Sequence, residues 1–387
     1  MSQISSFSLP NINYFGPNAS TKTASIAKDL NAKKVLIVTD VDLPATGIPD
    51  IIKYNLQENG LKAEIWSGAH QNPKDKDVHN GVKAFKTGHF DSIVAVGGGS
   101  AIDCAKGIRA VADNGGKIKD YEGNDKVKVK KTPLIAVATT AGTSSEADKL
   151  AVITSTETEG VLYKMGIFDW RILPDASIND PLLTTSLNKY YTAGTGMDVF
   201  THAAEAIMST GSTPFSDAMG LSAISLVTKW LKIAVEDGNN IEARSNMIYA
   251  VLFAGIAFNT ALLGITHSIS HPVGTYYDIH HGMCNAIILP KVCRFNFNES
   301  TEKLAMIAEA MHIDTSGMST IEAANKAIEG IEKLLVEIDA PHKLSDMGVG
   351  SDKIELMSID AYNDFCSGTN PRKATVEDFK AIYESLI

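Results

Sequence analysis

The sequence of 387 residues is poor in cysteine and contains no C-x-x-C pair. Its four cysteines are scattered, at Cys104, Cys284, Cys293 and Cys366. Small secreted domains held together by disulfides have much denser cysteine frameworks, so we interpret these residues as reduced thiols. Residues 1–16 contain neither a basic stretch nor an apolar run. The sequence therefore predicts no secretory signal and a cytoplasmic protein.

Positive charge is also scarce, because 35 Lys and Arg face 45 Asp and Glu, for a net charge of −10. Nucleic acids and anionic membranes attract basic surfaces, so this balance argues against both as main partners. One apolar run, Met247–Ile265, is long enough to cross a bilayer. Because it leads directly into a histidine-rich segment, we interpret it as a buried helix.

The composition, with 44% hydrophobic and 21% charged residues, allows a sizeable core, and the length allows two domains. Up to about residue 185, short β-branched runs alternate with segments of helical spacing such as Lys76–Thr87. The runs predicted as strands are Val35–Thr39, Ala63–Trp66, Ile93–Val96 and Leu134–Thr139. This alternation predicts, for residues 1–185, an α/β domain with a parallel sheet and helices on both faces.

Beyond about residue 187 the strand signals nearly vanish, and the remaining segments have helical spacing. These segments are Phe215–Val235, Ile241–Ile265, Thr301–His312, Ser319–Ile338 and Thr375–Ile387. The last two open with capping-box patterns, Ser319-x-x-Glu322 and Thr375-x-x-Asp378. The sequence therefore predicts an all-helical second domain over residues 186–387.

A glycine-rich loop follows the strand expected at Ile93–Val96, in the segment VGGGSAID. Glycines allow close backbone approach to a ligand, and the N–H groups of the next helix suit a pyrophosphate. The triplet alone is equally compatible with a tight strand–helix turn, and Ile102 replaces the third glycine of the G-x-G-x-x-G fingerprint.

Two further features favour a nucleotide site in this domain. Asp40 ends the strand VLIVTD, where its carboxylate could bind a ribose diol and repel a 2′-phosphate, which favours NAD over NADP. The hydroxyl-rich loop Thr139–Glu146 follows another expected strand. Although this second loop alone is typical of a hydrogen-bonded turn, the combination predicts a dinucleotide-binding domain.

Histidines gather in the second domain at a spacing that suits a metal site. Asp198 and His202 lie four residues apart, as do His267 and His271, and each pair shares a helix face. His281 follows ten residues after His271. A lone histidine on an apolar helix is usually a hydrogen-bonded core residue, but two such pairs beside another histidine favour metal binding.

The ligand set that we favour is Asp198, His202, His267 and His281. Nitrogen-rich coordination without thiolates suits Fe²⁺ or Zn²⁺ and does not suit Ca²⁺ or Mg²⁺. Such an ion would stabilise an alkoxide or polarise a carbonyl. His271 is then a candidate catalytic residue, as a proton relay or a group that orients the substrate. His280 is either a neighbour of the ligands or a surface residue.

With these residues in view, the chain resembles the iron-containing (group III) alcohol dehydrogenases, and within them the 1,3-propanediol and bacterial methanol dehydrogenase subgroup. The resemblance covers essentially the whole chain. The motifs that carry it include VGGGSAIDCAKG, TTAGTSSEAD, TAGTGMDVFTHAAEA and THSISHPVGTYYDIHHGMCNAIILP. The resemblance implies a dinucleotide-binding α/β domain, an all-helical metal-binding domain, and reversible hydride transfer between NAD(H) and small primary alcohols or diols and their aldehydes.

The resemblance also assigns residues. The family's metal ligands fall on Asp198, His202, His267 and His281, and its histidine near the nicotinamide and substrate falls on His271. Asp40 falls at the adenine ribose, and the pyrophosphate contacts fall on Gly98, Gly99 and Ser100. Further cofactor contacts are implied at Asn72, Asp103, Thr139, Thr140 and Lys164. Relatives form dimers or decamers, so we expect a homo-oligomer.

Several residues near the expected substrate position depart from the family pattern, among them Thr260, Leu262, Thr275 and His280. They leave open a functionalised short aldehyde, such as lactaldehyde or sulfoacetaldehyde, as the substrate. A dehydroquinate synthase-like lyase is an alternative of another class, but its metal ligands are Glu/His/His. A non-enzymatic, metal-stabilised assembly component is the third alternative.

Overall fold

The computed structural model describes residues 6–158 and 161–387 of the chain. The chain forms two compact units. Ser8–Ser186 make up the first, and Leu187–Ile387, together with Ser6 and Phe7, make up the second.

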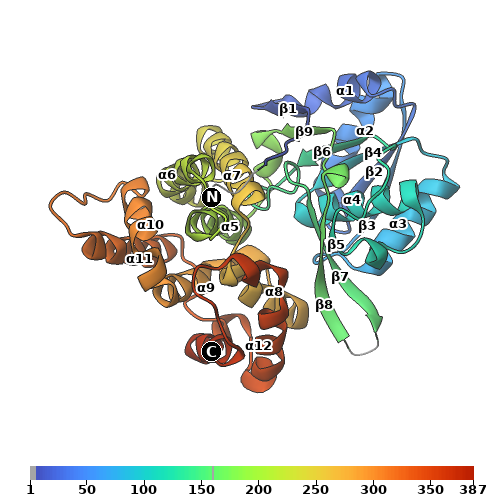
Figure 1. Cartoon of the computed structure of the whole chain (residues 1–387). Coiled ribbons are helices and arrows are strands. Elements are labelled where there is room, and N and C mark those ends of the chain that lie inside the picture. Colours follow the sequence, from blue (N-terminus) through green and yellow to red (C-terminus); the bar gives the residue numbers. More distant parts are fainter. Residues whose placement is uncertain (1–5, 159–160) are drawn as a thin grey trace. The chain divides into compact units, whose positions relative to one another are not determined.

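The first unit is built on a six-stranded parallel sheet (Figure 1). Its strands are β1 (Ile12–Phe15), β2 (Lys34–Asp40), β3 (Lys62–Ala69), β4 (Ser92–Gly97), β6 (Leu134–Ala138) and β9 (Ala176–Asn179), in the order β1-β9-β6-β4-β2-β3. The parallel sheet is therefore confirmed, and the four predicted strands correspond to β2, β3, β4 and β6. The sequence prediction missed β1 and β9, which have only four residues each and carry polar side chains.

Helices cover both faces of this sheet because successive side chains of a strand point to opposite faces. The helices are α1 (Thr23–Asp29), α2 (Ile48–Glu58), α3 (Asp75–Thr87) and α4 (Gly99–Asn114). In β2, Leu36 and Val38 belong to one buried cluster with residues of α3 and α4. Val35 and Ile37 belong to a second cluster with residues of α1 and α2. The predicted three-layer α/β architecture is thus confirmed.

A second, smaller sheet accompanies the first, in the order β5-β8-β7. Its strands are β5 (Gly123–Asn124), β7 (Leu150–Thr158) and β8 (Val161–Phe168). β7 and β8 pair antiparallel and form the long ribbon seen in Figure 1. The sequence prediction missed these strands. Short 3-10 helices link elements of both units: Ala19–Lys22, Leu43–Thr46, Ile118–Tyr121, Trp170–Ile172, Pro181–Thr184, Ser345–Met347, Ser351–Lys353 and Phe365–Thr369.

All the long elements described between Leu187 and Ile387 are α-helices, as predicted. They are α5 (Lys189–Met208), α6 (Pro214–Glu236), α7 (Ile241–Ala261), α8 (Ile265–Tyr277), α9 (His281–Phe295), α10 (Phe297–Ala310), α11 (Thr320–Glu337), α12 (Ile354–Asn363) and α13 (Val376–Leu386). Both predicted capping boxes are present, at Ser319 before α11 and at Thr375 before α13. Each side-chain oxygen accepts a hydrogen bond from the backbone three residues later.

The single helix predicted over Ile241–Ile265 was wrong. α7 ends at Ala261, because Leu262 adopts φ 64° and ψ −171°, a conformation that is rare outside glycine. A new helix, α8, begins at Ile265, so His267 and His271 lie on α8 and not at the end of the apolar helix. The break at Leu262 therefore separates the apolar helix α7 from the histidine-bearing helix α8.

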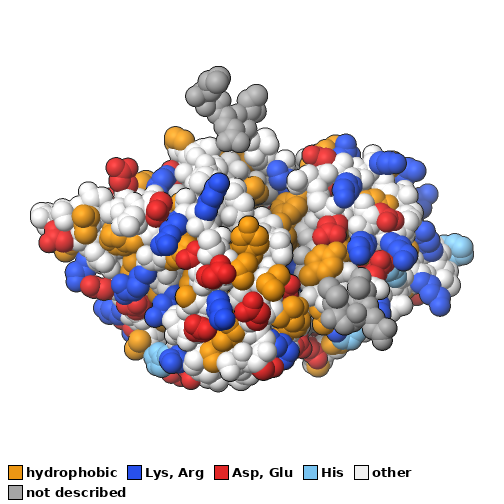
Figure 2. Space-filling model, turned by 60° about the horizontal axis from the view of Figure 1, so that its bottom comes forward, with side chains coloured by type: hydrophobic (Ala, Val, Ile, Leu, Met, Phe, Trp, Pro, Cys, Tyr) orange, Lys and Arg blue, Asp and Glu red, His pale blue; other side chains and the backbone are white. Residues whose placement is uncertain are grey.

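Two helices, α6 and α7, are long and apolar enough to cross a membrane by length and composition. This is weak evidence, because core helices of soluble proteins meet the same test, and 61% of the apolar window of α7 is buried inside the protein. On the face shown in Figure 2, acidic and basic side chains are interspersed with hydrophobic ones. Acidic and basic side chains are therefore mixed on that face.

Candidate active site

Helix α5 places two of the predicted ligands on one buried face. Asp198 and His202 are separated by one helical turn, and only 2% and 5% of their surfaces are exposed. Asn188 caps the helix by accepting a hydrogen bond from the Tyr191 N–H. The cap and the buried face fix the direction in which the two side chains project.

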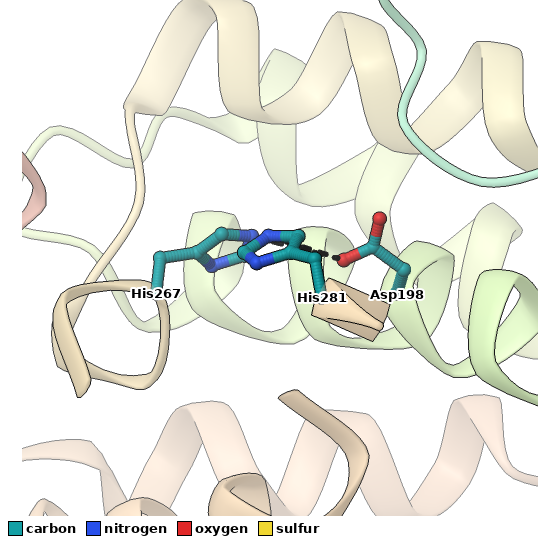
Figure 3. A group of neighbouring side chains, drawn as sticks. All are labelled: Asp198, His267 and His281. Carbon is teal, nitrogen blue, oxygen red and sulfur yellow. Dashed lines mark ion pairs between the residues drawn. The ribbon is translucent and has the colours of Figure 1, made fainter. Parts of the chain in front are cut away.

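Two more predicted ligands converge on the same carboxylate from α8 and α9. One oxygen of Asp198, Oδ1, lies 3.9 Å from His267 Nε2 and 3.8 Å from His281 Nε2. Figure 3 shows both imidazoles directed at this carboxylate. His202 Nε2 lies 3.9 Å from the same oxygen, and its ring stacks on that of His267 at 4.7 Å. The structure thus brings Asp198, His267 and His281 into one compact group, whose ligand atoms all lie within 4.8 Å of one another, and places His202 beside Asp198.

The distances among these atoms suit a shared cation better than direct hydrogen bonds. A hydrogen bond between nitrogen and oxygen rarely exceeds about 3.2 Å. Two ligand atoms about 2.1 Å from one ion at a tetrahedral angle are about 3.4 Å apart. The 3.8 and 3.9 Å separations around Asp198 Oδ1 are closer to the second arrangement. The donor set, one carboxylate oxygen and three imidazole nitrogens, fits a borderline divalent ion.

The side chain of Asn285 also indicates that a positive group belongs at this position. Its Nδ2 lies 2.7 Å from Asp198 Oδ1, 3.2 Å from His267 Nε2 and 3.1 Å from His281 Nε2. The amide hydrogens thus point to the place where the ligand lone pairs converge. Asn285 Oδ1 is buried and has no hydrogen-bond partner among the residues that the structure describes. The residues present therefore fit a metal ion.

Glu205, which the sequence prediction missed, binds His267 at Nδ1, the ring nitrogen that faces away from Asp198. Its Oε2 accepts a hydrogen bond from His267 Nδ1 at 2.6 Å, and its Oε1 accepts one from the Thr266 N–H at 2.6 Å. Burial alone would raise the pKa of Glu205, but His267 and Thr266 outweigh burial and hold this pKa below its ordinary value. Burial likewise disfavours the imidazolium of His267, yet Glu205 and Asp198 raise its pKa. These carboxylates favour positive charge at the centre.

His271, the predicted catalytic neighbour, lies beside the predicted ligands and has a carboxylate partner of its own. Its ring stacks on that of His281 at 5.3 Å, and its Nδ1 lies 2.7 Å from Asp364 Oδ2. Burial disfavours the Asp364 carboxylate, but His271 and the Cys366 N–H outweigh this effect and hold the pKa of Asp364 below its ordinary value. The sequence prediction missed Asp364, which lies 93 residues after its partner.

His280, whose role was left open, is the N-cap residue of helix α9. Its Nδ1 accepts a hydrogen bond from the Met283 N–H at 3.3 Å, and its ring meets that of Tyr191 edge-on at 5.2 Å. Next to the predicted ligand His281, Gly282 approaches α5 so closely that a Cβ there would lie 2.3 Å from the Gly194 carbonyl oxygen. His280 therefore caps the helix that carries His281 as its first residue.

In the α/β unit, the predicted cofactor residues gather at the carboxyl edge of the sheet. β3 lies on one side of β2 and β4 on the other, so the strand order reverses at β2. Ligands of open α/β sheets bind outside the strand ends at such a switch point. Asp40 ends β2, the glycine loop follows β4, and Thr139 follows β6 and donates its N–H to the Gly97 carbonyl. Asp40 Oδ1 accepts the Asp42 and Leu43 N–H groups.

The two predicted loops touch each other at Gly98 and Gly99, where a side chain would crowd the opposite loop. A Cβ on Gly98 would lie 3.0 Å from the side chain of Thr140, and one on Gly99 would lie 2.7 Å from that of Thr143. Ser100 is the second residue of α4, whose first N–H groups have no partner within the helix. The loops thus leave backbone N–H groups at a helix start, as a phosphate site requires.

The remaining predicted cofactor residues are held by protein partners. Lys164 Nζ donates to Asn72 Oδ1 at 2.7 Å. Asp103 is 8% exposed, its Oδ2 accepts the Val152 N–H, and burial raises its pKa to about 6. The structure therefore pairs Asn72 with Lys164 and turns Asp103 inward, toward the buried Lys106.

Two models of known protein families match nearly the whole chain. A family model described as iron-containing alcohol dehydrogenase matches residues 10–181. A second model, the C-terminal part of the Fe-containing alcohol dehydrogenase family, matches residues 192–387. The two models together span both compact units.

Individual relatives agree with these models. The chain is 41% identical over 384 residues to an NAD-dependent methanol dehydrogenase of Bacillus methanolicus, covering 99% of this chain and 100% of the relative. It is 42% identical over 377 residues to a 1,3-propanediol dehydrogenase of Klebsiella pneumoniae, covering 97% of each. Among solved structures, a 1,3-propanediol oxidoreductase superposes with a TM-score of 0.96 at 41% identity over 100% of both chains.

Proposed function

Because the chain belongs to the iron-containing alcohol dehydrogenase family and is an NAD(H)-linked oxidoreductase of small alcohols and aldehydes, we propose that Asp198, His202, His267 and His281 hold its metal ion. The observation that carries this proposal is the convergence of three imidazole Nε2 atoms on one oxygen of Asp198, at 3.8 to 3.9 Å. We propose Fe²⁺ as the ion, with Zn²⁺ as the alternative that accepts the same ligands. When bound, it supplies a Lewis acid for the substrate oxygen.

His271 is the group that we propose for moving the substrate proton. Asp364 holds its Nδ1 at 2.7 Å, which leaves Nε2 for exchange with the alcohol or with water. Stacking on His281 keeps the ring beside the ligand group. Asp364 acts through His271 and is therefore a positioning residue.

For the dinucleotide, we propose Asp40 at the adenine ribose and Gly98, Gly99 and Ser100 at the pyrophosphate. The switch point of the sheet and the mutual contact of the two loops support this assignment. A carboxylate at the ribose repels a 2′-phosphate, so NAD(H) is preferred to NADP(H). Further contacts are proposed at Asn72, Asp103, Thr139, Thr140 and Lys164. The α/β unit is thus the dinucleotide-binding domain, and the helical unit is the metal-binding catalytic domain.

The substrate class that we propose is small primary alcohols or diols and their aldehydes, in line with the relatives named for methanol and 1,3-propanediol. A functionalised short aldehyde, such as lactaldehyde or sulfoacetaldehyde, is the alternative within the same chemistry. We further propose that the enzyme works in the cytoplasm as a homo-oligomer, a dimer or a decamer.

The test uses His267→Ala and Asp198→Ala in protein reconstituted anaerobically with Fe²⁺ or Zn²⁺. Each variant should lose bound metal and the oxidation of NADH with short aldehydes, because removing one ligand leaves an incomplete site. Glu242→Gln, an exposed change on α7, serves as the matched control and should keep both properties. Full activity of either ligand variant without bound metal would contradict the proposed metal site.

A further inference from the structure

Beyond the ligands, one buried carboxylate links two of the helices that carry them. Glu205 lies on α5, 2% exposed, and its partners Gly264, Thr266 and His267 belong to the start of α8. We propose that Glu205 is a positioning residue that fixes His267 as a metal ligand and thereby sets the affinity of the centre. This inference rests on the proposed function, since it assumes that His267 binds the metal.

The contacts use both oxygens of the carboxylate. Oε2 accepts from His267 Nδ1 at 2.6 Å and from the Gly264 N–H at 3.1 Å, and Oε1 accepts from the Thr266 N–H at 2.6 Å. The first N–H groups of a helix have no partners within it, and the helix dipole favours an anion there. Glu205 therefore closes the N-terminus of α8 and holds the ring of His267 with the same group.

The hydrogen bond at Nδ1 decides which nitrogen of His267 can bind a metal. A neutral imidazole carries one proton, so a ring that donates from Nδ1 presents a lone pair at Nε2. His267 Nε2 is the atom that lies 3.9 Å from Asp198 Oδ1. A carboxylate behind a ligating histidine fixes its tautomer and orientation in this way and makes it a stronger ligand.

The chain leading into α8 is held as firmly as the ring. A Cβ on Gly264 would lie 3.0 Å from Glu205 Oε1, so the carboxylate sits against bare backbone. The Ala261 carbonyl accepts the Ser209 hydroxyl, and the Leu263 carbonyl accepts the Thr369 hydroxyl at 2.6 Å. Between these two anchors, Leu262 keeps its glycine-like conformation. The path from α7 to His267 is therefore fixed from both sides.

Replacing Glu205 by Gln exposes the role of the second oxygen. The amide has the same size, but only one of its two terminal atoms can accept a hydrogen bond. If its oxygen faces Thr266, its NH₂ faces His267 Nδ1, which then has to accept, and the proton moves to Nε2, the ligating atom. If its oxygen faces His267, its NH₂ faces the Thr266 N–H, so that two hydrogen-bond donors meet and neither finds an acceptor. Either arrangement weakens the site without removing a ligand.

The experiment measures metal affinity directly. Zn²⁺ affinity is obtained by competition with a chromophoric chelator, and Co²⁺ is used as a spectroscopic probe, in wild type, Glu205→Gln and the control Glu242→Gln. We expect Glu205→Gln to bind Zn²⁺ about 10- to 100-fold more weakly, as is usual for such partners of metal ligands. Its Co²⁺ absorption spectrum should shift, while NADH affinity and helical circular dichroism stay unchanged.

A second variant covers the case in which Glu205→Gln fails to fold. Glu205→Asp keeps the negative charge at the start of α8 but is one methylene too short to hold both His267 and Thr266, so its Zn²⁺ affinity should also fall. Unchanged affinity in a folded variant overturns the inference, and so does loss of folding in both, which would make Glu205 purely structural. Wild-type protein that binds neither Zn²⁺ nor Co²⁺ would instead overturn the proposed metal site.

Discussion

The buried carboxyl of Glu146 gives a stability effect whose pH dependence can be worked out. Glu146 lies in the loop after β6 with 3% of its surface exposed. Burial, with a further contribution from the Asp148 carboxylate, raises its pKa from 4.5 to about 7, against the lowering effect of Lys106. The folded protein therefore holds this proton more tightly than the unfolded chain does. Stability falls as the pH rises from 4.5 to about 7.

The magnitude follows from the difference between the two pKa values. At about 1.4 kcal/mol for each pKa unit, a rise of about 2.5 corresponds to about 3 kcal/mol. Above pH 7 the charged Glu146 therefore costs the folded state about 3 kcal/mol that is absent below pH 4.5. Glu146→Gln removes the charge and keeps the shape, so the variant should escape this cost.

The assay compares thermal midpoints of wild type and Glu146→Gln between pH 5 and pH 8. We expect a lead for the variant of only a few degrees at pH 5, which grows to about 6–12 °C at pH 8, at about 2–4 °C for each kcal/mol. Glu58→Gln, an exposed change on α2, should follow wild type at every pH. A Tm difference between Glu146→Gln and wild type that stays constant with pH would refute the reasoning.

Three further substitutions test local features. Leu262→Gly should raise the free energy of unfolding by about 1–2 kcal/mol in urea titrations, because glycine relieves φ 64°, whereas Leu262→Ala should bring no gain. Lys106→Met leaves the buried Asp103 and Asp148 without their cation and should cost about 3–5 kcal/mol by the same method; a loss below 1 kcal/mol would contradict this. Gly99→Ala should weaken NADH binding at least about tenfold by fluorescence titration, because its Cβ would meet Thr143 at 2.7 Å, whereas the unobstructed Gly368→Ala should not.

Much of the fold could be predicted because local patterns and tertiary structure agree. The buried strands β2, β4 and β6 are apolar runs, and the capping boxes at Ser319 and Thr375 mark real helix starts. The end of α7 could not be predicted, because Leu262 is a good helix former. The backbone leaves the helix there where the Ser209 and Thr369 hydroxyls bind the carbonyls on either side. Those partners are 52 and 106 residues away from the carbonyls that they bind.

The candidate site likewise has a part that the sequence predicts and a part that it does not. Its ligands could be proposed from spacing, since residues four apart share a helix face. The residues that orient them could not, because Glu205 in the segment HAAEA has the pattern of any glutamate on a helix. Only the fold brings it to His267, 62 residues later, and brings Asp364 to His271 across 93 residues. Loss of such an orienting partner typically weakens metal binding about 10- to 100-fold. The proposed ligand set therefore follows from sequence, but the contact that orients His267 follows from the packing of α5 against the start of α8.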